Sequence, residues 1–143
     1  MLKSIPAIIT PELLYSMALM GHGDILAIVD RNYPSHSVKR PVHHLSGVDT
    51  TTAAEAILSL FPVDDFLLPS AFRMTPDGEP NVLFPAHESF QQSLRRCEGR
   101  EIELQGLERT KFYALATAAF AVVQTTDDRP FSCFLVTKGV VAQ

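Results

Sequence analysis

The densest group of polar side chains in this sequence surrounds a short apolar run near the N-terminus. Gly21-His22-Gly23-Asp24 precedes the run Ile25–Val29, and Asp30 follows it. The His22 imidazole can transfer protons near neutral pH, because the ordinary pKa of histidine is about 6.5. The flanking glycines leave room for a ligand to approach the ring. The alternative is a solvated imidazole in a turn that ends a helix, and spacing alone favours that second interpretation.

Four further side chains could take part in chemistry. Asp30 ends an apolar strand, so its carboxylate either caps a loop or binds sugar hydroxyls, and spacing does not separate these two roles. Asp64 and Asp65 resemble an acid/base pair, but they are adjacent and follow a helix-ending Pro62, which favours a solvated turn. Cys133 is expected to be a small buried residue with an unreactive thiol.

Metal and nucleotide sites are not predicted. His43 and His44 are adjacent on a short strand pattern, so they point to opposite faces, and no third ligand lies at a useful spacing. Gly21-His22-Gly23 is followed by an apolar run instead of a helix start with further glycine, so it is no phosphate loop. We therefore expect a site without a metal or other cofactor.

Composition limits the class of protein. The 143 residues are 46% hydrophobic and carry a net charge of −4, which suits one globular domain over residues 1–143. No stretch is basic enough for nucleic acid, and no apolar run approaches the roughly 20 residues of a membrane span. Prolines interrupt the N-terminus where a secretory signal would be apolar, so we expect a cytoplasmic protein. Cys97 and Cys133 are expected to be reduced thiols.

Helical and strand patterns alternate along most of the chain. Thr10-Pro11-Glu12 has the form of a helix start, and Thr52–Glu55 has the form of a capping box. The patterns predict helices over 11–20, 52–61, 85–98 and 108–119, and strands over 25–29, 42–45, 66–68, 71–72, 101–104, 120–123 and 131–136. This order predicts a three-layer α/β domain whose mostly parallel central sheet is covered by helices on both faces.

The chain resembles the L-fucose mutarotase and D-ribose pyranase family over nearly its whole length. The most specific block is Met20-Gly21-His22-Gly23-Asp24. The other matching segments are Met1-Leu2-Lys3, Ile9–Leu14, Asp30 with Tyr33–Ser37, Leu60-Phe61 with Asp64, Arg109 with Phe112-Tyr113, Ala119–Val123 and Lys138–Val140. Arg109 places the chain closer to the fucose branch, since ribose pyranases carry histidine there.

The resemblance implies an isomerase that interconverts the α and β anomers of a free monosaccharide, L-fucose or a related sugar. His22 would transfer protons and Tyr113 would assist it. Asp30, Asp64 and Arg109 match positions that bind sugar hydroxyls, a role that suits carboxylates and a guanidinium. Such a reaction needs two proton-transfer groups and no metal or redox cofactor.

One segment departs from the family pattern. The family's Tyr-x-Asn pair in the last strand, which contacts the sugar, is Phe131-Ser132-Cys133 here, and Arg31 replaces a small residue beside Asp30. These changes predict a less polar pocket and a shifted substrate, or alternatively a non-catalytic sugar-binding or regulatory protein on the same fold. Family members form octamers or decamers with sites shared between neighbouring subunits, so the resemblance also implies a homo-oligomer.

Overall fold

The polypeptide forms one six-stranded sheet with helices on both sides. The computed structural model describes residues 1–142. The elements in chain order are α1 (Pro11–Leu19), β1 (Ile25–Val29), the 3-10 helix η1 (Ser35–Ser37), β2 (Val42–Leu45), α2 (Thr50–Leu58), β3 (Ala71–Thr75), α3 (Pro85–Glu98), β4 (Leu104–Glu108), α4 (Arg109–Ala116), β5 (Ala119–Thr125) and β6 (Phe134–Thr137).

The sheet is mostly parallel, as the alternating pattern predicted. Its strand order is β2-β5-β1-β6-β3-β4. β5 pairs in parallel with β1 and β2, β3 pairs in parallel with β4, and β6 is antiparallel to both β1 and β3. Five strands therefore run in one direction and β6 alone is reversed. Consequently the carboxyl ends of the five parallel strands meet at one end of the sheet, where open α/β sheets place ligand sites.

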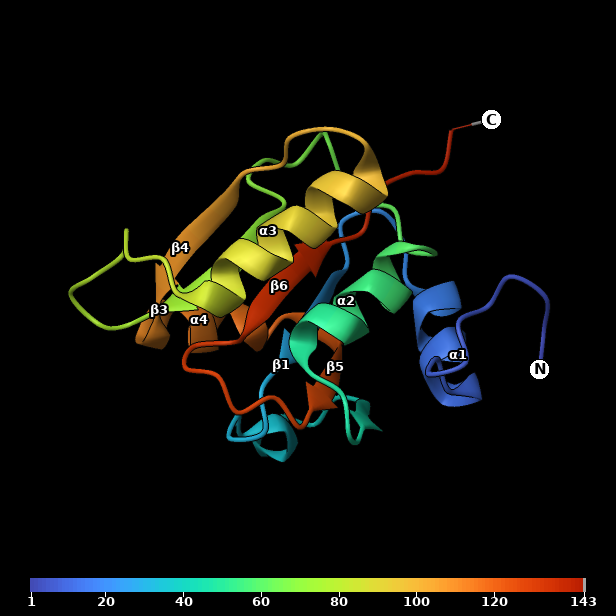
Figure 1. The fold of residues 1–143 in the computed structure, drawn as a ribbon, viewed down its shortest axis with the longest axis horizontal. Coiled ribbons are helices and arrows are strands. Elements are labelled where there is room, and N and C mark those ends of the chain that lie inside the picture. Colours follow the sequence, from blue (N-terminus) through green and yellow to red (C-terminus); the bar gives the residue numbers. More distant parts are fainter. Residues whose placement is uncertain (143) are drawn as a thin grey trace.

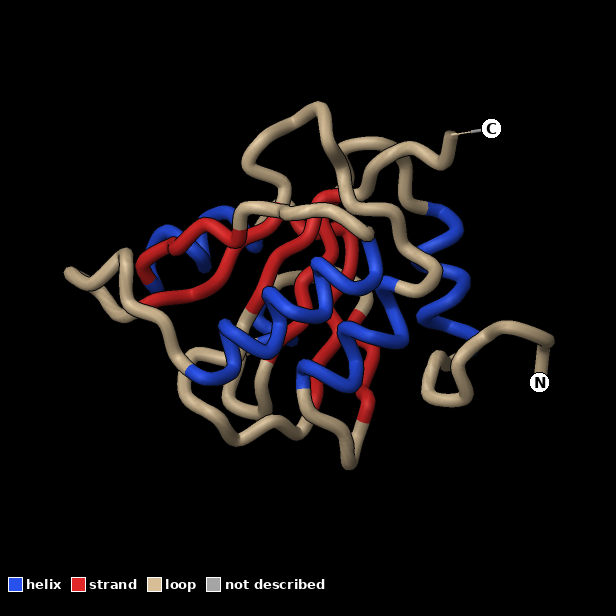
Figure 2. Tube along the Cα trace, turned by 45° about the horizontal axis from the view of Figure 1, so that its top comes forward, coloured by secondary structure: helices blue, strands red, loops and turns tan. Residues whose placement is uncertain are grey.

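Alternating side chains on β1 show why the sheet needs cover on both faces. Leu26 and Ile28 pack into a core formed with α1, α2 and α3, whereas Ala27 and Val29 pack into a second core formed with α4. All four side chains are fully buried. Figure 1 shows α2 and α3 in front of the sheet with α4 behind it, and Figure 2 shows the same layers in a second view. The predicted three-layer architecture is confirmed.

The two predicted helix starts have different outcomes. The Leu13 amide donates to Thr10 Oγ1 at 3.1 Å, and Pro11 is the first helical residue, as predicted. α2 begins at Thr50, two residues earlier than the capping-box pattern indicated. The reason is Asp49, whose carboxylate accepts from the Thr52 amide at 2.7 Å and so caps the helix one turn before the predicted site.

Two predicted strands are wrong. Residues 66–68 form bends, because the Asp64 carboxylate accepts the Leu67 amide that a strand would use for pairing. β4 begins at Leu104, where the alternating pattern of 101–104 was expected to end. The carbonyl of Ile102 is already taken by the Gln91 side chain at 2.7 Å, so it does not join the sheet.

The C-terminal third also differs in its boundaries. α4 spans 109–116 and not 108–119, because β5 begins at Ala119 and continues to Thr125. β6 begins at Phe134, so Phe131 and Cys133 precede the strand in which they were expected. Phe131 has a φ of 54°, a left-handed conformation incompatible with a strand. Within residues 1–142, no helix has the length and apolar character needed to cross a membrane.

Candidate active site

His22 forms a polar pair at the amino end of β1. Its Nε2 lies 2.8 Å from Oδ1 of Asp64, which is fully buried while 42% of the His22 side chain is exposed. The second Asp64 oxygen accepts from the Leu67 amide at 2.7 Å. The edge of Phe66 packs on the imidazole, with ring centroids 5.7 Å apart. The expectation of a solvated turn at Asp64 is therefore wrong, because the turn folds its carboxylate inward onto His22.

Hydrogen bonds keep the Asp64 carboxylate ionised. Burial alone would raise its pKa, but the Leu67 amide and the His22 ring outweigh this and lower the pKa below its ordinary value. An ionised carboxylate can only accept hydrogen bonds, so His22 must donate through Nε2–H. The lone pair of the neutral ring is then on Nδ1, the nitrogen that could accept a proton from a ligand.

Two glycines hold this pair in place. Gly23 has a φ of 91°, and its amide donates to the Lys138 carbonyl at 2.9 Å, which fixes the turn that presents His22. At Gly139 any Cβ would lie 2.8 Å from Cα of Asp64, so only glycine lets the chain after β6 pass this close to Asp64.

A second group of predicted residues lies at the carboxyl end of β1. Asp30, Tyr113, Phe131 and Cys133 line one cavity of about 370 Å³. The other residues of its lining are Asn32, Tyr33, Met74, Asp128, Arg129 and Pro130. They come from four separate stretches of chain that the sheet topology brings to the same end. We call this cavity the Asp30 pocket.

Burial favours the neutral forms of three side chains in the Asp30 pocket, those of Asp30, Tyr33 and Cys133. Burial raises the pKa of Asp30 above its ordinary value, although the Asn32 amide and the Cys133 thiol partly oppose it. Burial, together with the nearby Asp30 charge, also raises the pKa of Cys133, which agrees with the expected unreactive thiol. Burial and the neighbouring Cys133 and Tyr113 raise the pKa of Tyr33 to about 12.

Arg109 lies beside this pocket. Its guanidinium carbon is 5.6 Å from the centroid of the Tyr113 ring, within range of a cation-π contact. Its Nη2 pairs with Asp77 Oδ2 at 3.1 Å, and both side chains are about half exposed. The pair holds Arg109 next to Tyr113 while leaving the guanidinium accessible to a ligand.

The structure does not bring all the predicted residues together. In space, His22 and Asp64 lie at the amino end of β1, whereas Asp30 and Tyr113 lie at its carboxyl end. The five residues of β1 are separated by four steps of about 3.3 Å, so the strand is about 13 Å long and keeps the two groups well apart within one chain. Because a proton is transferred over about 3 Å, one small ligand on a single chain would not reach both His22 and Tyr113.

Sequence patterns missed a charged pair, Asp127 and Arg129, of which Arg129 lines the Asp30 pocket. Asp127 is buried and accepts from the Thr50 amide at 2.8 Å and from Arg129 Nη2 at 2.7 Å. Burial would raise the pKa of Asp127, but these bonds lower it strongly. The network ties the loop before β6 to the start of α2. The signal that could have found it is a turn-rich Asp-Asp-Arg sequence directly after a buried strand.

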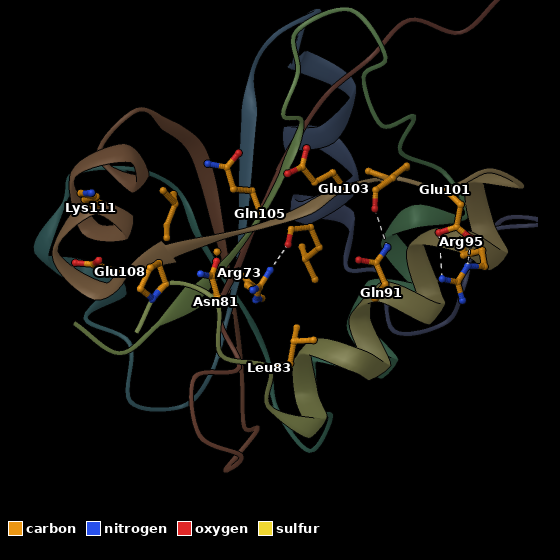
Figure 3. Close-up of a pocket in the computed structure, with 15 residues that line it drawn as sticks. Arg73, Asn81, Leu83, Gln91, Arg95, Glu101, Glu103, Gln105, Glu108 and Lys111 are labelled. Carbon is orange, nitrogen blue, oxygen red and sulfur yellow. Dashed lines mark hydrogen bonds and ion pairs between the residues drawn. The ribbon is translucent and has the colours of Figure 1, made fainter. Parts of the chain in front are cut away.

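Another large cavity contains none of the predicted site residues. It has a volume of about 930 Å³ and lies along β4 and α3. Figure 3 shows that Arg73, Gln91 and Arg95 each make a polar contact within this lining. Its three basic side chains are matched by three acidic ones, so it has no preference for a ligand of either charge. Within residues 1–142, no group of three or more His, Cys, Asp or Glu side chains could hold a metal ion.

Together, the fold and these two ends define a small α/β protein equipped for acid/base chemistry on a hydroxyl-rich small molecule. The chain belongs to the RbsD / FucU transport protein family, whose model matches residues 3–141. It is 37% identical to a fucose mutarotase of Bos taurus over 99% of this chain and 95% of that protein. The resemblance predicted from the sequence is confirmed.

Two solved structures show the same fold. FucU from Bifidobacterium longum superposes with a TM-score of 0.90 at 31% identity, covering 98% of this chain and 100% of that one. The fucose mutarotase of Streptococcus pneumoniae in complex with L-fucose gives a TM-score of 0.85 at 30% identity, covering 99% and 100%.

Proposed function

We propose that this protein is a monosaccharide mutarotase, an isomerase that interconverts the α and β anomers of L-fucose or a related sugar. Its relatives named fucose mutarotase cover almost the whole chain, which favours this activity over a non-catalytic sugar-binding role. The structural observation that carries the proposal is His22, exposed on one side and held through Nε2 by the buried Asp64 carboxylate. We assign the whole of residues 1–143 to this one activity.

The reaction needs two proton transfers and no net redox change. One group removes the proton of the anomeric hydroxyl while another gives a proton to the ring oxygen, so that the bond between C1 and the ring oxygen breaks. The resulting aldehyde rotates, and the reverse transfers close the ring on its other face. In our assignment His22 is the first proton-transfer residue, with Asp64 fixing its tautomer and stabilising the imidazolium. Tyr113, through its phenol hydroxyl, is the second proton-transfer residue.

The Asp30 pocket supplies the groups that bind the sugar. Asp30 is partly buried with a raised pKa, so its carboxylate gains from hydroxyl groups that donate to it. Arg109 is positioned to reach a hydroxyl beside Tyr113. Phe131 and Cys133 make the remaining wall less polar than a tyrosine and an asparagine would. Asp64 binds the sugar only through its hold on His22, because its own oxygens face His22 and Leu67.

We further propose a homo-oligomer, an octamer or decamer, in which the His22 of one subunit completes the Asp30 pocket of its neighbour. The separation of the two groups across β1 supports this arrangement. A second support is the segment Phe66–Leu68, whose three large apolar side chains are each more than half exposed beside His22. Light scattering tests the assembly, and a mass near the 15.8 kDa of one chain would exclude a shared site.

The cysteines support a cytoplasmic location, which we also propose. Cys97 is exposed and Cys133 is buried, and neither forms a disulfide.

Saturation-transfer NMR of anomeric protons tests the activity itself. Saturating one anomer of L-fucose, D-galactose or D-ribose should reduce the signal of the other anomer when the protein is present. No transfer above the uncatalysed level for any of these sugars would overturn the mutarotase assignment.

A further inference from the structure

His87 is a fully buried histidine that the proposed reaction does not use. It lies in the first turn of α3. The Phe84 amide donates to its Nδ1 at 3.1 Å, and its Nε2 lies 3.0 Å from the carbonyl oxygen of Phe131. A backbone amide can only donate and a carbonyl can only accept, so the ring must be neutral with its proton on Nε2. Burial lowers the pKa of His87, in agreement with this state.

The partner of His87 has a conformation that needs support. Phe131 has a φ of 54°, which non-glycine residues adopt only when the surrounding structure enforces it. Its ring stacks on Phe84 with centroids 5.1 Å apart and an interplanar angle of 21°. Phe84 is also the residue whose amide bonds His87. The start of α3 thus holds Phe131 twice, through its carbonyl and through its ring.

Phe131 in turn forms part of the wall of the Asp30 pocket. We propose that His87 is a positioning residue for sugar binding: its Nε2–H fixes the carbonyl of Phe131, which holds the left-handed turn and so places the apolar wall opposite Asp30. This inference rests on the proposed function. It assigns His87 no contact with the sugar.

The hydrogen bond also sets what this wall can offer to a ligand. Because its oxygen accepts from His87, the carbonyl of Phe131 is less available to a ligand than a free carbonyl would be. A sugar edge that faces Phe131 is therefore selected for its C–H groups and not for a hydroxyl, because a buried hydroxyl there would lack this partner.

Two substitutions separate the His87 bonds. In His87→Gln the side-chain amide can reach the position of Nε2 and donate to Phe131, whereas in His87→Asn the shorter side chain can serve only the position of Nδ1 near Phe84. Each variant keeps one polar partner. If the Phe131 bond matters for sugar binding, His87→Asn should raise the Kd for L-fucose about fivefold or more, the usual worth of one hydrogen bond. His87→Gln should stay within about twofold of the unaltered protein.

His43→Phe is the matched control for general loss of stability. His43 is half-buried on β2 and bonds Ser16 Oγ at 2.8 Å, so this variant also loses a histidine hydrogen bond, away from Phe131. Its Kd for L-fucose should not change. Equal Kd values for His87→Asn and His87→Gln, or an equal rise in His43→Phe, would overturn the positioning role.

A second measurement does not depend on sugar. Long-range 1H–15N spectra of histidine-labelled protein should show His87 as the neutral form protonated on Nε2, with its signals lost in His87→Asn. A ring protonated on Nδ1, or on both nitrogens at pH 7, would contradict the inference. If the unaltered protein bound none of L-fucose, D-galactose and D-ribose, the proposed function would be wrong. The role of His87 in sugar binding would then be wrong as well. If the protein binds a sugar with the same Kd in the His87 variants as in the unaltered protein, the positioning role of His87 is contradicted while the proposed function stands.

Discussion

A partly or fully buried carboxylate lies at each end of β1. Burial raises the pKa of both, but hydrogen bonds outweigh this effect at only one of them. Asp64 receives bonds from Leu67 and His22, and its pKa is lowered. Asp30 has weaker compensation from Asn32 and Cys133, and its pKa is raised. At one end of the strand, a carboxylate whose hydrogen bonds are satisfied orients an imidazole. The other end has an under-satisfied carboxylate in a pocket, ready to accept hydroxyl groups. The comparison separates the proton-transfer end from the sugar-binding end.

The largest expected effect is on the proton-transfer end. His22→Ala should lower the rate of anomer exchange by about 10²–10⁴-fold, the usual cost of losing a general acid or base. Saturation-transfer NMR measures this rate on a responsive sugar. His22→Ala also removes a hydrogen bond from the buried Asp64 carboxylate, so a thermal unfolding curve serves as the control that the variant is still folded at the assay temperature. Exchange at the unaltered rate would remove His22 from the mechanism.

At the sugar-binding end, the expected effect is on specificity. Phe131→Tyr combined with Cys133→Asn restores a hydroxyl and an amide, so it should favour L-fucose over other sugars by about 1–3 kcal/mol for each restored partner. Ratios of exchange efficiency for L-fucose and D-ribose measure the change. If the unaltered protein already prefers L-fucose and the double variant does not increase that preference, these two positions do not set specificity.

The smallest expected effect is on stability, and it has opposite signs at the two ends. A lowered pKa means that Asp64 stabilises the fold above its unfolded pKa of about 4, and that this contribution is lost as pH falls through its folded pKa. Asp30 has a raised pKa, so it opposes folding when ionised and this cost is relieved as pH falls. Urea unfolding between pH 7 and pH 3 should therefore show a shallower acid loss for Asp64→Asn and a steeper one for Asp30→Asn. If the free energy of unfolding fell with pH equally steeply in both variants, the opposite pKa shifts of Asp64 and Asp30 would be contradicted.

Sequence patterns were more informative about layers than about the site's geometry. The strand Ile25–Val29 and the start at Thr10 could be predicted, because apolar periodicity and capping are local properties. The burial of Asp64 could not, since it depends on contacts with His22, 42 residues away. Phe131 was expected in a strand because its neighbours are apolar, whereas its left-handed conformation goes with contacts to His87 and Phe84 that are distant in the sequence. The resemblance named the site residues but not their separation across β1.

The separation of His22 from Tyr113 is the central claim, and it can be tested by mixing chains. His22→Ala and Tyr113→Phe should each lose at least about 10²-fold of anomer exchange when they assemble alone. When the two variants are unfolded together at equal amounts and refolded, chance assembly gives about a quarter of the shared sites an intact His22 facing an intact Tyr113. The account predicts recovery to about a quarter of the unaltered rate. A mixture no more active than the average of the two variants would contradict it.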